Sequence, residues 1–361
     1  MTIDFAELLT QVVERNASDL HVTPGAPPTI RIRGRLTPLE GFPKLDPSMT
    51  REIVYSILGN DQRQRLETDW QIDFAYSIPG LARFRVNAYY QRASIGAAFR
   101  LIPADLKTID QLGLPPVVHE LAKRPRGFVL VTGPTGSGKS TSLAAMIDEI
   151  NESREEHIMT IEDPIEFLHM HKRCLVNQRE LGADAQSFAL ALKAALRQDP
   201  DVILVGEMRD LETISTALTA AETGHLVFAT LHTQDTAQTI DRIIDAFPHG
   251  QQDQIRVQLS VALQGIITQQ LLPTADGAGR VCACEVLVPT PAVRNLIREG
   301  KTHQVPSVLQ TSGAAGMQTM DAALATLVRQ GKISQRLAEA RSSTPEELRR
   351  ILGARSLTAA A

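Results

Sequence analysis

The segment from Gly133 to Ser140 constrains this chain most, because it reads Gly-Pro-Thr-Gly-Ser-Gly-Lys-Ser and fits G-x-x-x-x-G-K-[ST]. The apolar run 128–131 before it predicts a strand, and a helix is predicted to begin near Lys139, which is the context this motif needs. The glycines let backbone N–H groups turn inward around an anion, and the helix N-terminus adds the positive end of its dipole. A glycine-rich turn that matches by accident is the alternative, and the flanking strand and helix argue against it.

The motif defines a set of candidate residues for binding ATP. Lys139 is expected to meet the β and γ phosphates, and Ser140 is expected to ligate Mg²⁺. The remaining candidates supply backbone N–H groups or lie beside them: Gly133, Pro134, Thr135, Gly136, Ser137, Gly138 and Thr141.

Short apolar runs alternate with helical segments beyond the middle of the chain, and they predict an α/β fold. Continuous rather than alternating apolar strands are typical of a parallel sheet that is covered on both faces. The predicted strands are 128–131, 158–161, 202–205 and 226–229.

The first hundred residues predict a smaller α+β unit. Apolar residues recur at helical spacing over 4–15, and period-two alternation predicts strands elsewhere. Helices are also expected at 50–58 and 61–67. The predicted strands are 29–36 with a turn at Gly34, 72–78 and 82–90 joined by a turn at 79–80, and 95–101.

Composition limits the classes of partner. The chain has 361 residues, 37 Lys and Arg against 41 Asp and Glu, a formal net charge of -4, and 4% aromatic residues. An acidic balance and few rings argue against a nucleic-acid partner, which normally requires a basic footprint. Three cysteines provide no disulfide framework, and no apolar run approaches the ~18 residues of a membrane span. With no signal peptide at its N-terminus, the protein is expected to be soluble and intracellular.

Carboxylates follow two of the predicted strands. The strand 202–205 closes on Gly206 and Glu207, as a Walker B strand does, although the usual aspartate is missing. Glu207 is therefore expected to reach Mg²⁺ through water, and a surface loop acid is the alternative.

A second acidic segment, Thr-Ile-Glu-Asp-Pro-Ile-Glu at 160–166, ends the strand 158–161. Ligands of α/β sheets bind beyond the carboxyl ends of the strands, where a carboxylate can orient or deprotonate the attacking water. Glu166 is the favoured residue for this role and Glu162 is the second choice. Solvated loop acids are the alternative.

Two histidines flank the strand 226–229. His232 and Thr230 fall at its carboxyl end and could sense the γ-phosphate, whereas His225 begins the strand at the opposite end. A structural histidine is the alternative for either.

These motifs, in this order, resemble those of the secretion and pilus motor ATPases, and of the type IV pilus retraction motors in particular. The resemblance covers nearly the whole chain. It includes Asn-Ala-Ser-Asp-Leu-His at 16–21, Arg-Gln-Asp-Pro-Asp at 197–201, and Ala-Val-Arg-Asn-Leu-Ile at 292–297.

The resemblance implies a homo-hexameric, ATP-hydrolysing ring that drives pilus retraction and twitching motility. It implies a PAS-like N-terminal domain at 1–102, a linker at 103–115 and a RecA-like ATPase domain at 116–361, with a core at 116–290 and a helical part at 291–361. ATP would bind where the domains meet, and arginines would approach its phosphates. The candidates are Arg83 and Arg85, then Arg92 and Arg100.

The implied location and partners follow from the same resemblance. The ring would be cytoplasmic and docked peripherally at the inner membrane, on the platform protein of the pilus machine, without inserting into the bilayer. An accessory retraction ATPase would be a further partner.

Two other functions compete with this interpretation. One is an accessory, assembly or secretion motor of the same superfamily, but assembly motors typically carry paired C-x-x-C motifs, and this chain has only Cys282-Ala-Cys284. The other is a nucleic-acid translocase on the same core, which the acidic balance disfavours.

The segment 292–297 predicts an amphipathic helix. Val293, Leu296 and Ile297 share one face by i, i+3, i+4 spacing, and Arg294 and Asn295 point elsewhere. The hypothesis is that these polar groups couple hydrolysis to mechanical output, with an ordinary surface helix as the alternative. Further along, Thr344-Pro-Glu-Glu347 predicts a capping box.

Overall fold

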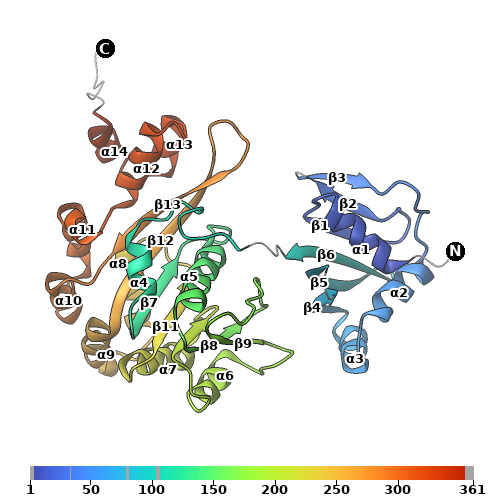
Figure 1. Ribbon diagram of the computed structural model, residues 1–361, viewed down its shortest axis with the longest axis horizontal. Helices are drawn as coiled ribbons and strands as arrows, with labels where there is room; N and C mark the ends of the chain where they lie inside the picture. Colours follow the sequence, from blue (N-terminus) through green and yellow to red (C-terminus); the bar gives the residue numbers. More distant parts are fainter. Residues whose placement is uncertain (1–3, 33, 79–80, 103–105, 354–361) are drawn as a thin grey trace. The chain divides into compact units, whose positions relative to one another are not determined.

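The computed structural model describes residues 4–32, 34–78, 81–102 and 106–353 (Figure 1). The chain forms two compact units, one of residues 1–105 with 164–168, and one of residues 106–163 with 169–361. The predicted turn at 79–80 and residues 103–105 of the predicted linker lie outside the described residues.

The first unit is built on an antiparallel sheet with the strand order β3-β2-β1-β6-β5-β4. Its core buries the apolar face of helix α1, Phe5–Glu14, including Leu8, Leu9 and Val12. Helices α2, Pro47–Ser56, and α3, Asn60–Asp69, complete it. The strands are β1 Asp19–Val22, β2 Thr29–Ile32, β3 Arg35–Pro38, β4 Gln71–Ile78, β5 Ala82–Gln91 and β6 Ser94–Ile102.

The turn predicted at Gly34 is present, and it makes the segment 29–36 a hairpin of β2 and β3, because Gly34 adopts a φ of +82°. The sequence analysis missed β1, which pairs with both β2 and β6. Four residues are too few for a period-two pattern to stand out.

The second unit contains a seven-stranded sheet with the order β13-β12-β7-β11-β10-β8-β9. All neighbouring pairs are parallel except β12 with the edge strand β13. Since the carboxyl ends of parallel strands meet at one edge, the loops after β7, β8, β10 and β11 share that edge. The strands are β7 Gly127–Thr132, β8 His157–Glu162, β9 Leu175–Glu180, β10 Val202–Val205, β11 Leu226–Leu231, β12 Leu263–Pro273 and β13 Arg280–Leu287.

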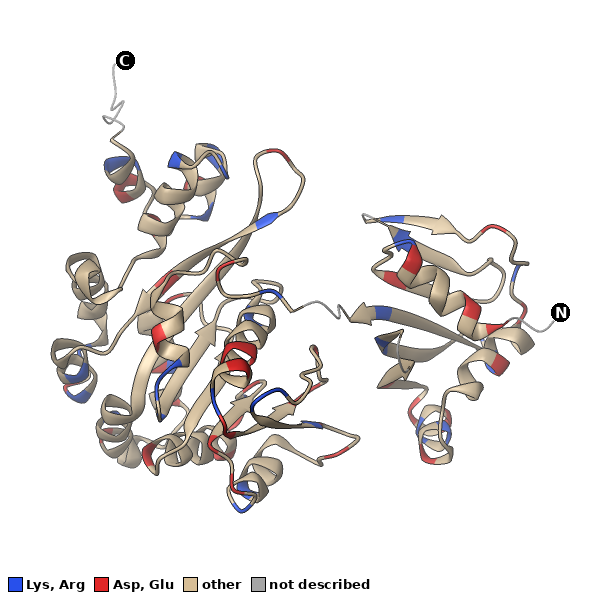
Figure 2. Ribbon diagram, in the orientation of Figure 1, with Lys and Arg blue, Asp and Glu red and all other residues tan. Residues whose placement is uncertain are grey.

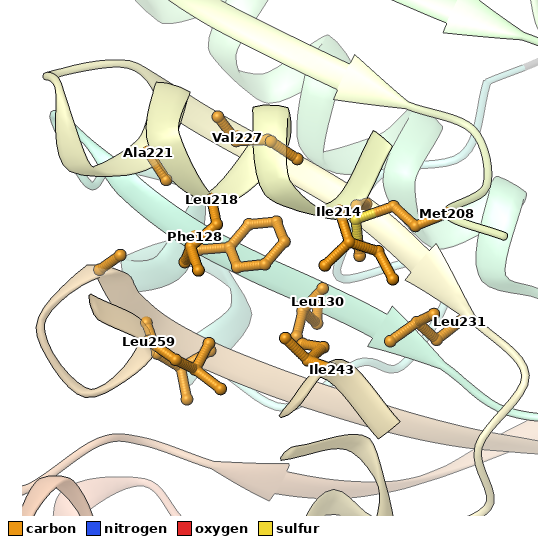
Figure 3. Close-up of a cluster of buried hydrophobic side chains, with 14 of the residues drawn as sticks. Phe128, Leu130, Met208, Ile214, Leu218, Ala221, Val227, Leu231, Ile243 and Leu259 are labelled. Carbon is orange, nitrogen blue, oxygen red and sulfur yellow. The ribbon is translucent and has the colours of Figure 1, made fainter. Parts of the chain in front are cut away.

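Helices cover both faces of this sheet, and the predicted α/β class is confirmed. Helices α4, Val117–Ala122, and α5, Lys139–Ser153, pack with Val129 and Val131 on one face. Phe128 and Leu130 point to the other face, where Figure 3 shows them among side chains such as Leu218 and Leu259. The helices there are α6 Phe188–Ala195, α7 Leu211–Glu222, α8 Thr236–Asp245 and α9 His249–Ala262.

The remaining helices form the C-terminal part of this unit (Figure 1). Three of them pack their own small core against Leu272 of β12 and Ala283 of β13. The elements are α10 Pro291–Arg298, η1 Thr302–Gln304, α11 Val305–Thr311, η2 Gly313–Ala315, α12 Met320–Arg329, α13 Gln335–Arg341 and α14 Pro345–Leu352.

Arg294 in α10 does not present its guanidinium as a free polar group, which corrects the sequence-based hypothesis. Its Nη1 donates to the carbonyl oxygens of Ser260 and of Val261, the latter at 2.9 Å, at the C-terminus of α9. Asn295 is exposed and donates to Glu299 at 2.7 Å. The Arg294 side chain therefore fastens α10 to α9, while Val293 and Ile297 are fully buried beneath it.

Two further expectations are corrected by local packing. Thr344 does not cap α14 with its side chain but donates its hydroxyl to Asp321, which ties α14 to α12. Residues 106–115 of the predicted linker belong to the second unit, where Ile109 and Leu114 are buried in the core.

Charged residues of both signs are interspersed along the chain of each unit, as the colours of Figure 2 show. Over the described part of the chain, no helix is both long enough and apolar enough to cross a membrane.

We predict that truncating Leu218 destabilises the second unit far more than the same change at Leu190. Leu218 of α7 is 1% exposed and Leu190 of α6 is 55% exposed. Leu218→Ala should lower the free energy of unfolding by about 2–5 kcal/mol. Leu190→Ala should change it by no more than about 0.5 kcal/mol. Equal losses in urea denaturation would show that the packing around Leu218 is not as described.

Candidate nucleotide-binding site

The loop after β7 adopts the conformation that its glycines permit. Gly133, Gly136 and Gly138 have φ values of +135°, +79° and +92°. A Cβ on Gly133 would lie 2.4 Å from the carbonyl oxygen of Gln269 and 2.7 Å from Oγ of Ser137. Any other residue at position 133 would therefore push the loop off β12.

Lys139 is the first residue of α5, and its ammonium group turns back into this loop. Nζ donates to the carbonyl oxygens of Gly133 at 2.8 Å and of Pro134 at 3.3 Å, and the residue is 9% exposed. Oγ of Ser137 is buried with no hydrogen-bond partner among the described groups. A buried lysine and this buried hydroxyl in a glycine-rich loop fit an anionic ligand.

A cavity of about 530 Å³ opens beside the loop, within the size range of small-molecule sites. Its walls come from the loop itself, from β12, from the segment after β11 and from α13. The lining residues are Pro134, Thr135, Gly136, Ser137, Gln234, Gln270, Leu271, Leu272, Ala340 and Arg341.

Glu207 follows β10 at the same edge of the sheet and lies between Arg209 and His232. One carboxylate oxygen accepts from Arg209 at 2.7 Å, and the other lies 3.1 Å from Nε2 of His232. The hydrogen bond from Arg209, and then the nearby Arg209 and His232 side chains, lower the pKa of Glu207 despite its partial burial. The carboxylate is therefore held ionised.

Glu162 ends β8 beside this pair. Its Oε1 accepts from the hydroxyl of Thr160 at 2.7 Å and from Nε2 of Gln178 at 3.2 Å. A Cβ on Gly206 would lie 3.2 Å from Cα of Glu162, so the glycine before Glu207 lets the two strand ends approach. The Thr230 hydroxyl donates to the Gly206 carbonyl at 2.5 Å and adds β11 to the group.

His225 lies at the other end of β11, as its place in the sequence indicates. Its Nδ1 is 3.0 Å from the carbonyl oxygen of Ala220, at the end of α7. The six residues of β11 separate it from His232, which corresponds to roughly 20 Å. Within the second unit, His225 is therefore not brought to the edge that carries Lys139.

The other candidates belong to the first unit. Glu166 lies in the segment 164–168, which groups with that unit. Arg83 and Arg85 lie on β5, where Arg83 is half-buried and donates to Ser77 at 3.3 Å, and Arg85 is exposed. Arg100 on β6 pairs with Asp19 at 2.9 Å. Arg92 lies in the turn between β5 and β6, with a φ of +46°.

Comparisons with known proteins agree with this site. The family model for type II/IV secretion system proteins matches residues 2–278. The chain is 51% identical over 344 residues to the type IV pilus retraction ATPase PilT of Pseudomonas aeruginosa, covering 95% of this chain and 99% of that one. It is 44% identical to the type IV pilus ATPase PilU of the same organism, covering 96% and 91%.

A solved structure, described as the pilus retraction motor PilT with bound ADP, matches with a TM-score of 0.91 and 52% sequence identity. The match covers 96% of this chain and 99% of that one. The chain belongs to the type II/IV secretion system ATPase family. The resemblance predicted from its motifs is confirmed, and the similarity to an ADP-bound structure supports nucleotide binding by this chain.

The sequence analysis missed several residues at this family site. Arg209 stands two residues beyond Glu207, so its proximity could have been predicted. Gln269 and Arg341 could not, because they lie more than a hundred residues from the loop and carry no motif. Only the pairing of β12 with β7 and the packing of α13 bring them near.

We predict that Lys139→Ala abolishes ATP turnover by this family member. The change removes the one side-chain cation that the loop buries, although the rest of the loop keeps its backbone donors. Turnover should fall to the assay background while the far-ultraviolet circular dichroism spectrum is unchanged. Lys193→Ala is the matched control, because that lysine forms only an exposed ion pair with Glu212. Substantial turnover in Lys139→Ala would refute the assignment of the loop.

Proposed function

We propose that the protein is a homo-hexameric ATPase that retracts type IV pili and so drives twitching motility. The ring is cytoplasmic and docks peripherally at the inner membrane on the platform protein of the pilus machine. An accessory retraction ATPase is a further partner.

The observation that carries this proposal is the end-to-end match to PilT of Pseudomonas aeruginosa, at 51% identity over 99% of that chain. A protein of Neisseria gonorrhoeae described as a twitching motility protein is 52% identical over 89% of this chain. By contrast, the match to the pilus assembly ATPase PilB of Thermus thermophilus is 35% identical and covers 32% of that protein.

In the proposed mechanism, the backbone N–H groups of residues 133–141 and the Lys139 ammonium hold the phosphates of ATP. The Ser140 hydroxyl and the ionised Glu207 carboxylate hold Mg²⁺, directly or through water, and these oxygen donors suit its preference for hard ligands. When bound, Mg²⁺ neutralises charge that develops on the phosphate oxygens. His232, fixed against Glu207, senses the γ-phosphate from the end of β11.

A carboxylate orients and deprotonates the attacking water. Glu162 lies at the strand edge that carries Glu207, and it is held by Thr160 and Gln178. Glu166 comes four residues later, on the segment grouped with the first unit. Glu166 is the proposed base and Glu162 is the second candidate. One experiment distinguishes between the two glutamates.

We predict that the amide variant of the true base binds ATP but does not hydrolyse it. Glu166→Gln and Glu162→Gln keep the size of the side chain, but an amide cannot accept the proton of the water. The measurements are steady-state turnover and equilibrium binding of a fluorescent ATP analogue. Asp163→Asn, an exposed acid of the same segment, is the matched control. Loss of binding together with turnover would assign a structural role to that glutamate.

Arg83 and Arg85 are proposed to stabilise the charge of the transition state. An arginine in this role contributes about 10³–10⁵ in rate, far more than a solvated charge on a strand. Arg83, which is half-buried, and Arg85, which is exposed, alternate with buried residues on β5, and neither contributes to the core of the first unit.

At least one of Arg83→Ala and Arg85→Ala is therefore predicted to lower turnover by about 10³-fold or more with little change in nucleotide affinity. Arg35→Ala, which removes an exposed arginine from β3, serves as the control. Near-normal turnover in both variants would transfer the role to Arg92 or Arg100. Normal turnover in all four variants would refute the proposal that one of these arginines stabilises the transition state.

Deleting the gene in its own host tests the proposed function directly. Cells without a retraction motor should carry long, abundant pili that do not shorten, because assembly continues unopposed. Complementation with the wild-type gene should restore retraction, and complementation with Lys139→Ala should not. Cells without pili would indicate an assembly motor instead. Retraction that persists with reduced force would indicate the accessory role suggested by the similarity to PilU.

A further inference from the structure

Four threonine hydroxyls connect the strand that enters the phosphate-binding loop to the residue after His232. Thr132 ends β7 directly before Gly133, and its Oγ1 lies 2.8 Å from Oγ1 of Thr268 on β12. Thr239 of α8 lies 3.5 Å from Thr132 and 2.7 Å from Thr233. Thr132, Thr268 and Thr239 are all 0% exposed, so solvent cannot replace these contacts.

Thr239 is the junction of this chain of hydroxyls. Its Oγ1 is 2.7 Å from the carbonyl oxygen of Asp235, which can only accept a hydrogen bond. A hydroxyl has one proton to donate and two lone pairs that accept. Thr239 directs its one proton at the Asp235 carbonyl and, at the longer distance of 3.5 Å, at Oγ1 of Thr132. The hydroxyl of Thr233 then donates to Thr239, so one hydroxyl links Thr132 to Thr233.

The first turn of α8 that carries Thr239 is itself firmly held. Asp235 caps the helix by accepting from the N–H of Gln238 at 2.7 Å. Oε1 of the buried Glu285 accepts from both the N–H and the hydroxyl of Thr236, each at 2.9 Å. The Thr239 hydroxyl therefore occupies a fixed position between two loops that approach the nucleotide.

The Thr239 hydroxyl holds the backbone next to His232 in place. Thr233 is half-buried and follows His232 immediately, and His232 in turn contacts Glu207 at 3.1 Å. The link from Thr239 to Thr132, at 3.5 Å, is the longest in the chain of hydroxyls, and it joins the entrance of the phosphate-binding loop to Thr233.

We propose that Thr239 is a positioning residue, which holds the His232 loop in register with the phosphate-binding loop through the hydroxyls of Thr233 and Thr132. The inference rests on the proposed ATPase function. Thr239 does not touch the nucleotide, and it acts by keeping His232 and Glu207 in place when the γ-phosphate is present.

The test compares Thr239→Val, Thr233→Val and the double variant in the full-length protein. Valine keeps the branched shape and removes the hydroxyl. Each single change should lower kcat for ATP about three- to tenfold, the effect of one lost hydrogen bond, with KM and nucleotide affinity nearly unchanged. The double variant should be no slower than the slower single variant, because both changes break the same link.

Two variants serve as controls. Thr239→Ser retains the hydroxyl and should restore kcat. Thr219→Val removes a hydroxyl that, like that of Thr239, donates to the carbonyl four residues earlier, but on the exposed side of α7, and should leave kcat unchanged.

The outcomes separate the inference from the function on which it rests. A wild-type protein without ATPase activity would overturn the proposed function. A wild-type protein that is active, with normal kcat in both valine variants or with additive losses in the double variant, would overturn the inference alone. If Thr239→Val does not fold, Thr233→Val, at a half-buried position, tests the inference by itself. A normal kcat in that variant would also overturn the inference.

Discussion

The parallel pairing of β7, β11, β10 and β8 is the constraint on which the rest of the second unit depends. Parallel strands have their carboxyl ends at one edge of the sheet, so each strand delivers the residues that follow it to the same place. Lys139, Glu162, Glu207 and His232 are spread over about a quarter of the chain, yet each comes within a few residues of the end of one of these strands. The register of the strands determines which of these four residues lie next to one another.

The close approach of these strand ends depends on small residues at two positions. Gly133 allows the phosphate-binding loop to lie against the backbone of Gln269, and Gly206 allows the Walker B strand to lie against Glu162. In both places a methyl group would meet backbone atoms, which cannot move aside as the end of a flexible side chain can. The strand ends of the site therefore lie close together because glycine leaves room for the neighbouring backbone at both positions.

The neighbouring charges and hydrogen bonds then determine whether the partly or fully buried carboxylates are ionised. Burial alone would raise the pKa of Glu207, but the hydrogen bond from Arg209 and the nearby His232 reverse the effect. Glu285, with no cationic partner among its described contacts, behaves in the opposite way, and desolvation raises its pKa. The two carboxylates have different surroundings, since Glu207 pairs with Arg209 and Glu285 accepts hydrogen bonds from Thr236 in the first turn of α8.

The local sequence predicted the strands β7, β8, β10 and β11, the turn at Gly34 and the glycine-rich loop after β7, because periodicity and glycines act over a few neighbouring residues. The Arg294 contact with α9 and the Thr344 contact with Asp321 were mispredicted from patterns that describe one element at a time. The positions of Gln269, Arg341 and Thr239 near the loop carry no sequence signal at all. Only the tertiary structure decided them, because hydrogen bonds and packing between segments more than a hundred residues apart depend on strand order and register rather than on local pattern.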